Sequence, residues 1–385
     1  METNKTIGIV LPGFSILCVC LVAAAGVLAQ QPGLVDSGKP TFTTFDAPGA
    51  GAAQLEGTFP VSLAAGIIAG SVDTAGPGNL IQGFVRAADG AITDFIPGGA
   101  DTVSTVPAAI NATGTITGYY IHASNESGSL AYVSYGFVRS ADGTFTTFSA
   151  PNAGNGAYPY HQGTYALSIN TAGTIAGYYT DANGLSHGFT GTAGGTITSF
   201  DPIGSAGTYG ESINAAGAIA GYYVDDVAGA YHGFVRTVDG AITSFDAPGA
   251  GTGPVRGTQA WSINTAGTIA GYYSDASGLD HGFVRAASGA MATFDVPGAG
   301  TAQGEGTFAL SINAAGAIAG SYTNKNELSY GFVRAAGGAI STFRVPGAGT
   351  GSGYATHAAS IDNGGAVAGF YFDANGVVHG FLLTK

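Results

Sequence analysis

The sequence predicts an all-β fold, a seven-bladed β-propeller of four-stranded blades, and three observations carry that prediction. Aligned on a Gly-Phe dipeptide, the 385 residues contain seven copies of one unit, and the last three copies are each spaced by 49 residues. Each copy offers short apolar or alternating runs separated by Gly, Asn and Asp turns, the pattern of consecutive antiparallel strands. The last copy lacks its fourth run, and a matching run, residues 41–45, stands near the start of the chain. We therefore expect the N-terminal strand to complete the last blade and close the ring.

The fifth unit shows how each element is predicted. We assign strand a to residues 258–263, strand b to 268–273, strand c to 282–286 and strand d to 290–294. The seventh unit has strands a, b and c at residues 356–361, 366–371 and 380–384. No run shows the 3.6-residue period of an amphipathic helix over a sufficient length.

Glycine and phenylalanine recur at fixed places in these units. A glycine lies inside strand b of every unit, where we expect another part of the chain to approach closely. These glycines are Gly70, Gly118, Gly177, Gly221, Gly271, Gly320 and Gly369. The Phe of each Gly-Phe pair and the Phe that ends each strand d are expected to pack between blades and to dominate stability.

Composition excludes several classes of protein. The 66 glycines accompany 45% hydrophobic and 11% aromatic residues, which a disordered Gly-rich chain would lack. A net charge of -13, from 24 acidic and 11 basic residues, repels phosphate backbones. We therefore predict no nucleic-acid partner.

Residues 1–29 are predicted to be a signal peptide. Lys5 precedes an apolar run over residues 7–29 that ends in small residues suited to cleavage after Ala29. The run of 23 residues is also long enough for a retained membrane anchor. With cleavage, residues 30–40 form a polar lead, residues 41–385 form the propeller, and the mature chain does not span a membrane. Both cysteines, Cys18 and Cys20, would be removed, so no disulfide is expected.

Segments such as residues 168–179, Ser-Ile-Asn-Thr-Ala-Gly-Thr-Ile-Ala-Gly-Tyr-Tyr, followed by His187-Gly-Phe, resemble the HAF-type bacterial extracellular repeat proteins. The family pattern is Ile-Asn-x-x-Gly-x-x-x-Gly and then His-small-Phe, and the resemblance covers almost all of the mature chain. Gly replaces the middle Ala of the tripeptide, and Gln82, Tyr135 and Tyr330 replace its His. The resemblance implies secretion and a repeat fold, and it brings no established activity.

Repeated polar residues are predicted to stabilise turns rather than to perform chemistry. Four histidines begin strand c, yet rotational symmetry separates them, so we predict no metal site and a hydrogen bond to the b–c turn instead. These residues are His187, His232, His281 and His379. The Asn residues after strand a are likewise assigned to their own turns. An Arg that recurs on strand c has no evident partner.

We expect a functional site in segments that depart from the repeat, on the face shared by the b–c turns and the d–a crossovers. The b–c segment from Tyr120 to Gly136 and the crossover from Phe148 to Thr164 both span sixteen residues, which is longer than in the other units. Aromatic and polar side chains in these two segments suit a carbohydrate or a protein ligand. The candidate ligand-binding residues are His122, Asn125, Glu126, Tyr132, Tyr158, Tyr160 and His161. Two tolerated surface insertions are the simpler alternative.

Strand a also carries residues that differ between units. Glu211, Gln259, Trp261 and His357 are expected to meet near the mouth of a central channel and are further ligand-binding candidates. A packing substitution is the alternative for Trp261. The leading hypothesis is a secreted, monomeric, non-enzymatic scaffold that binds an extracellular carbohydrate or protein, with no catalytic residue, metal or cofactor. The alternatives are a hydrolase or lyase that uses Glu211 and His357, and a purely structural envelope protein.

Overall fold

The computed structural model describes residues 40–75, 80–126, 129–156, 162–351 and 356–384, all within the compact unit Leu34–Lys385. These residues form 28 strands and no helix. The all-β prediction is confirmed. In this part of the chain no helix is long and apolar enough to cross a membrane.

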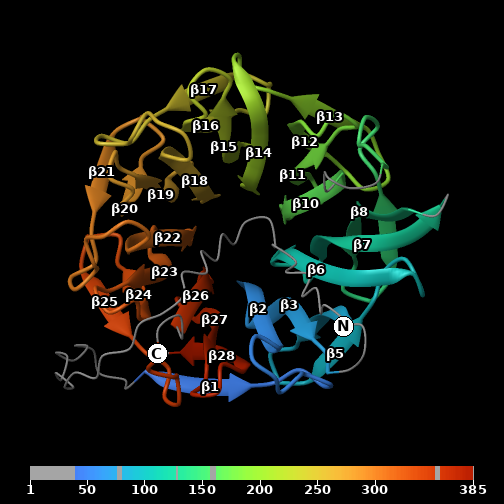
Figure 1. The fold of residues 1–385 in the computed structure, drawn as a ribbon, viewed down its shortest axis with the longest axis horizontal. Coiled ribbons are helices and arrows are strands. Elements are labelled where there is room, and N and C mark those ends of the chain that lie inside the picture. The colour runs from blue at the N-terminus through green and yellow to red at the C-terminus, as the bar shows by residue number, and fades with distance from the viewer. Residues whose placement is uncertain (1–39, 76–79, 127–128, 157–161, 352–355, 385) are drawn as a thin grey trace, which may run out of the picture. The chain divides into compact units, whose positions relative to one another are not determined.

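Antiparallel pairing arranges the strands in sets of four, in chain order (Figure 1). Sets 1 and 2 are β2 (Gly57–Ala64), β3 (Ile67–Asp73), β4 (Ile81–Arg86), β5 (Ile92–Phe95), and β6 (Thr102–Ile110), β7 (Ile116–Glu126), β8 (Ser129–Arg139), β9 (Phe145–Phe148). Sets 3 and 4 are β10 (Gly163–Ile169), β11 (Ile175–Thr180), β12 (Ser186–Gly191), β13 (Ile197–Phe200), and β14 (Ser205–Ile213), β15 (Ile219–Asp225), β16 (Tyr231–Arg236), β17 (Ile242–Phe245). Sets 5 and 6 are β18 (Gly257–Ile263), β19 (Ile269–Ser274), β20 (Asp280–Arg285), β21 (Met291–Phe294), and β22 (Gly306–Ile312), β23 (Ile318–Thr323), β24 (Ser329–Arg334), β25 (Ile340–Phe343).

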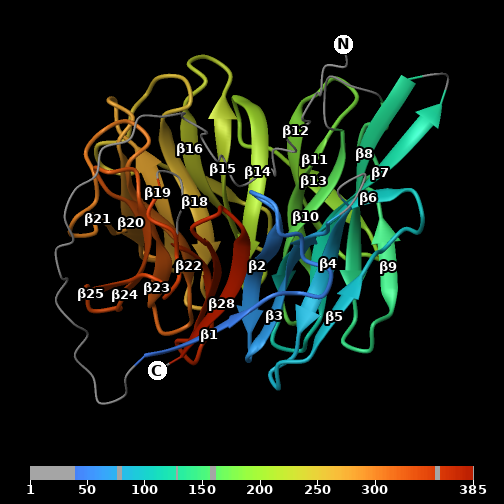
Figure 2. The same ribbon diagram turned by 60° about the horizontal axis from the view of Figure 1, so that its bottom comes forward.

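Set 7 draws on both ends of the chain. It contains β26 (Thr356–Ile361), β27 (Val367–Phe372), β28 (Val378–Thr384) and β1 (Thr41–Phe45). Strand β1 pairs antiparallel with β28, with Phe45 opposite Gly380, the same register that places Phe294 opposite Gly282 in set 5. The first strand of each set is innermost in Figure 1, and Figure 2 shows β1 crossing beside β28. Hydrogen bonding joins the strands into one sheet of 16 and one of 12.

Predicted strand bounds agree with the structure to within two residues in sets 5 and 7. In set 5, strand c (β20) begins earlier than predicted because His281 already pairs with Tyr273. Set 2 departs further from the prediction. Residues placed in a long b–c loop continue the ladder instead, as β7 and β8 run to Glu126 and from Ser129 and form an extended hairpin.

The innermost strand of every set contains a β-bulge, and the bulge explains the glycine in strand b. In β18 the bulged residue, Trp261, has no opposite partner, and the ladder resumes at Ser262. A Cβ on Gly271 would lie 2.1 Å from the Gln259 carbonyl oxygen. Only glycine fits such a close backbone approach, so the expectation for this position is confirmed.

Aromatic packing joins neighbouring sets. The Phe of each Gly-Phe pair is fully buried and meets the terminal Phe of the preceding set at a steep angle, as Phe283 meets Phe245 with ring centroids 6.1 Å apart. The recurring Arg of strand c lies over the same ring, with Arg285 Cζ 4.6 Å from the Phe245 centroid. This cation–π contact accounts for the Arg that the sequence left without a partner.

Two polar contacts also link neighbouring sets. The Ser262 hydroxyl accepts a hydrogen bond from the Ile312 backbone N–H at 3.2 Å, and the Asn264 side-chain amide donates to the Asn313 carbonyl at 3.1 Å. The Asn264 Oδ1 also accepts from its own turn, at Thr268 N. The Asn residues therefore hold their turns, as predicted, and tie adjacent sets as well.

Candidate functional site

The repeated histidines are held between pairs of aspartates. His281 Nδ1 donates to Asp295 at 2.8 Å, and its Nε2 lies 3.7 Å from Asp275, which caps the b–c turn. His187, His232 and His379 repeat this arrangement. Hydrogen bonds from the turn backbone, that of Ala228 first, lower the pKa of Asp225 to about 2. Within the described residues no three His, Cys, Asp or Glu side chains gather in a way that could hold a metal ion.

The b–c turns and d–a crossovers lie on one face, as predicted. Backbone hydrogen bonds connect each crossover to these turns, for example Gly251 N to Ser274 O and Val255 N to Gly229 O. This surface is called the turn face below. It is the face on which asymmetric features were expected.

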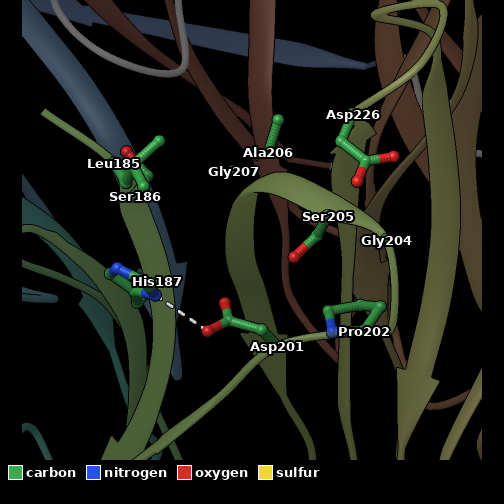
Figure 3. A pocket seen from close by; sticks show the side chains of 10 residues that line it. All are labelled: Leu185, Ser186, His187, Asp201, Pro202, Gly204, Ser205, Ala206, Gly207 and Asp226. Atoms are coloured by element: carbon green, nitrogen blue, oxygen red, sulfur yellow. Dashed lines mark hydrogen bonds and ion pairs between the residues drawn. The ribbon is translucent and has the colours of Figure 1, made fainter.

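A hollow of about 220 Å³ opens on the turn face between sets 3 and 4 (Figure 3). One wall is the start of β12, with Ser186 and His187, and Asp201 lies beside His187 at the base. The other wall is the start of β14, with Ser205, and the adjoining turn, with Asp226.

A short crossover creates this hollow. Seven residues lie between Phe200 and Thr208, whereas twelve lie between Phe245 and Thr258 in the next crossover. The longer crossover lays its last residues along the neighbouring strand c, where Gly257 forms a parallel bridge with Tyr231. Equivalent bridges occur at four more junctions, and none joins β12 to β14.

The glycines at the ends of these two crossovers also differ in how closely they approach the neighbouring strand c. A Cβ on Gly257 would lie 2.0 Å from the Tyr231 carbonyl oxygen, whereas the nearest atom to a Cβ on Gly207 would be the Tyr209 hydroxyl, 3.5 Å away. Gly257 has a φ of 116°, while Gly207 keeps a negative φ. The edge of β12 is therefore left uncovered at the hollow.

The hollow is acidic and has an apolar rim. The Asp226 carboxylate makes no hydrogen bond or ion pair with another described residue, and Asp201 is bound to His187. Leu185 lines the hollow and is 47% exposed, and Ile203 and Val227, each next in sequence to a lining residue, are 102% and 92% exposed. The sequence did not point to these residues, because the lengthened segments and the variable strand a positions were taken as the places of function, and this crossover is shortened.

Four of the seven ligand-binding candidates in the two lengthened segments belong to the described residues. His122 in β7 places its Nε2 3.6 Å from Asp101 and its ring edge-on to Tyr135. Tyr132 pairs with Ala123 in the β7–β8 hairpin. Asn125 and Glu126 pair with Leu130 and Ser129 nearer its tip. Tyr158, Tyr160 and His161 lie outside the described residues.

Three of the strand a candidates share the same tyrosine neighbours. Gln259 accepts a hydrogen bond from Tyr272 at 3.4 Å, and the Trp261 ring stacks on Tyr272 with centroids 5.9 Å apart. Burial raises the pKa of Glu211 to about 8. Burial first, and then nearby acidic groups that include Glu211, raise the pKa of Tyr222 and Tyr272.

His357 belongs to a different cluster. It stacks on Phe370 with centroids 4.8 Å apart, and burial lowers its pKa to about 4. Glu211 and His357 lie on β14 and β26, which belong to different sheets, and no hydrogen bond, ion pair or ring contact of the described residues joins them. The structure thus gathers Glu211, Gln259 and Trp261 around common neighbours and leaves His357 apart.

Comparison with known proteins finds likeness in solved structures alone. No protein-family model matches the chain, and no curated protein matches it. Puromycin hydrolase is similar with a TM-score of 0.53 and 14% identity over 83% of this chain and 51% of that one. The BP39L lectin from Burkholderia pseudomallei has a TM-score of 0.51 and 11% identity over 86% and 94%. The β-propeller domain of the Trilobed protease from Pyrococcus furiosus has a TM-score of 0.49 and 10% identity over 84% and 94%.

These similarities concern the fold. At such identities, likeness to puromycin hydrolase and to the lectin supports a propeller scaffold and no particular activity. The chain spans about half the length of the puromycin hydrolase chain that it matches.

The arrangement of side chains is suited to binding. The histidines are occupied by aspartate pairs, whereas the hollow offers an uncovered strand edge, a free carboxylate and an apolar rim. Strand edges, carboxylates and exposed aliphatic side chains are common recognition elements for partners.

Proposed function

We propose that the chain is a seven-bladed β-propeller, closed by β1, which acts as a secreted, non-enzymatic scaffold and binds a protein or carbohydrate ligand on its turn face. Contacts between sets 7 and 1 support the closure. The Leu63 N–H donates to the Ser360 hydroxyl at 3.1 Å, and the Arg86 guanidinium lies 5.0 Å from the Phe45 ring centroid. The serine contact also joins five other pairs of neighbouring sets, and the cation–π contact four.

Secretion and membership of the HAF-type repeat proteins form part of the proposal. They rest on the predicted signal peptide, residues 1–29, and on the recurring Ile-Asn and His-Gly-Phe segments. The low proportion of charged residues, 9%, and the absence of cysteine after residue 20 agree with an extracytoplasmic protein.

The observation that carries the binding proposal is the concentration of asymmetry on the turn face. The hollow between sets 3 and 4 and the extended hairpin of set 2 are departures from a repeat that is otherwise regular, and both lie next to set 3. A scaffold of repeated units displays function where the repeat is broken, because the repeated residues are already used for packing.

The alternative, a hydrolase or lyase, has one observation in its favour. With a pKa of about 8, Glu211 would be protonated at neutral pH and able to act as a general acid. Its proposed partner His357 lies in a separate cluster, so Glu211 would have to act with another group.

Truncating the hairpin tests the scaffold proposal. Residues 124–131 are replaced by Asn-Gly, a two-residue turn that suits the paired Ala123 and Tyr132. The purified protein is then assayed on a glycan array and in pull-downs of surface proteins. We expect the truncated protein to lose the ligands that the intact protein captures.

The control is Val238→Asp, which changes an exposed residue in the turn between β16 and β17. It should leave ligand capture unchanged. Full retention of every ligand by the hairpin variant would contradict the placement of the site on this part of the turn face. Turnover of a captured glycan or peptide that is lost in Glu211→Gln would favour the enzymatic alternative.

A further inference from the structure

The hollow between sets 3 and 4 is the place where the chain fails to cover its own strand. At the neighbouring junction the crossover residue Arg256 accepts a hydrogen bond from the Tyr231 N–H at 2.6 Å through its carbonyl. Glu305, Gln162 and Glu56 do the same for Asp280, Ser134 and Val378. An extended stretch of the chain is thus the normal occupant of this position.

We propose that the uncovered start of β12 binds an extended peptide segment of a partner protein, which pairs with the strand at Ser186 in place of the missing crossover and presents a lysine or arginine to Asp226 and Asp201. This inference rests on the proposed function and assigns the ligand class of one site on the turn face. It is β-strand addition, in which main-chain hydrogen bonds provide affinity and side-chain sites provide specificity.

The size of the hollow favours a peptide over a free small molecule. Its volume of about 220 Å³ is below the roughly 300–1,000 Å³ of small-molecule sites. This volume can hold one large side chain and its backbone, and the rest of the bound peptide would lie across the rim of the hollow.

The composition of the walls decides against a carbohydrate here. Sugars are recognised by stacking on flat aromatic faces, and His187 is the only aromatic residue among the lining residues. Leu185, which lines the hollow, and the exposed Ile203 and Val227, which adjoin lining residues in sequence, instead provide aliphatic surface for side chains of an extended peptide.

The negative charge of the hollow favours a cationic residue at the centre of the bound peptide segment. Asp226 has no partner among the described residues, and the whole chain carries a net charge of -13. A cationic side chain is therefore attracted both locally and from a distance, while an acidic one is repelled. His187 is already held by two carboxylates, those of Asp181 and Asp201.

Blocked pentapeptides test the assignment, with Val and Thr at the outer positions and Lys, Arg, Gln or Glu at the centre. Binding to the full chain is followed by amide chemical shifts and by calorimetry at low salt. We expect the Lys and Arg peptides to shift the Ser186 and Gly207 amides, and to bind at least tenfold more tightly than the Glu peptide. N-methylation of the central peptide bonds should abolish binding, because it removes the main-chain donors.

Variants of the protein provide matched comparisons. Asp226→Asn should weaken the Lys peptide about tenfold, which corresponds to about 1.4 kcal/mol. Ala206→Trp fills the hollow from an exposed position and should weaken every peptide at least tenfold, whereas Ala302→Trp, exposed in another crossover, should have no effect.

Replacing residues 201–207 by the sequence of residues 246–257 restores a long crossover. The graft should cover β12 with the protein's own chain and abolish peptide binding. If the graft does not fold, Ala206→Trp still decides the question. Equal binding of the Lys and Glu peptides, or unaltered binding to Ala206→Trp, would overturn the inference.

The two proposals fail in different ways. Loss of glycan or protein capture in the hairpin variant, together with no peptide binding to the intact chain, would refute the peptide site and leave the scaffold function standing. Glycan-induced shifts at Ser186 and Gly207 would also refute the peptide assignment. Peptide binding that persists when the intact chain captures nothing else would support the peptide site and refute the broader ligand range.

Discussion

A serine follows the bulge in every set except set 2, and its hydrogen bond allows a measurable prediction about how neighbouring sets hold together. In Ser262→Ala the Ile312 N–H loses the hydroxyl that accepts its hydrogen bond at 3.2 Å. Ile312 is 7% exposed, so its N–H would be left largely without water. A buried donor without a partner costs about 1–3 kcal/mol. We expect the free energy of unfolding to fall by that amount in urea.

The chain contains a natural counterpart to this variant. At the equivalent position set 2 has Ala109, so no hydroxyl faces Ile169. Ala109→Ser should therefore stabilise the protein by about 0.5–1.5 kcal/mol and slow hydrogen exchange of the Ile169 amide. Ser288→Ala, at an exposed turn residue, is the control and should change stability by less than about 0.5 kcal/mol. Equal stability of Ser262→Ala and the control would refute the reasoning.

Three further predictions follow from contacts and pKa shifts. Arg285→Ala should lower the free energy of unfolding by about 1 kcal/mol, because the guanidinium lies 4.6 Å from the Phe245 centroid; no loss in urea denaturation would contradict the cation–π contact. The pKa of Glu211 is raised from 4.5 to about 8, so the native state holds a proton that the unfolded state has already lost at neutral pH. The free energy of unfolding should therefore fall as pH rises from about 5 to 8, and Glu211→Gln should remove this dependence on pH. The pKa of Asp225 is lowered from 3.8 to about 2, so its contribution is present above about pH 4 and should be lost as pH falls towards 2; an unchanged acid limb in Asp225→Asn would argue against it.

Local patterns in the sequence were sufficient to predict the strands. Alternating apolar residues bounded by Gly and Asn turns locate β18 to β21 to within two residues, because strand and turn preferences act over a few neighbouring positions. The glycine of strand b was also predictable, since a glycine inside a strand indicates a close approach. The bulge that causes the approach was not evident, because a bulge depends on the partner strand.

Contacts between sets were harder to predict. The sequence left Arg285 without an evident partner, because its partner Phe245 belongs to the preceding unit. Asn264 was correctly assigned to its turn, yet its amide also reaches Asn313 in the next set. A repeat sequence shows which residues recur, and it does not show which copies of them meet across an interface.

The hollow between sets 3 and 4 shows how a shortened segment can create a site. Lengthened segments attracted attention because added residues bring side chains that bind ligands. The crossover after Phe200 instead lacks five residues relative to the crossover that follows it, and the structure shows what the longer crossover does: its last residues cover the start of strand c in the set that it leaves. Their absence leaves main-chain groups at the edge of β12 with no equivalent covering, beside the Asp226 carboxylate, which has no partner among the described residues. In a repeat protein, a contraction can therefore expose a strand edge that the crossovers cover at five other junctions. The distance from Phe200 to Thr208 was a signal for this site in the sequence itself.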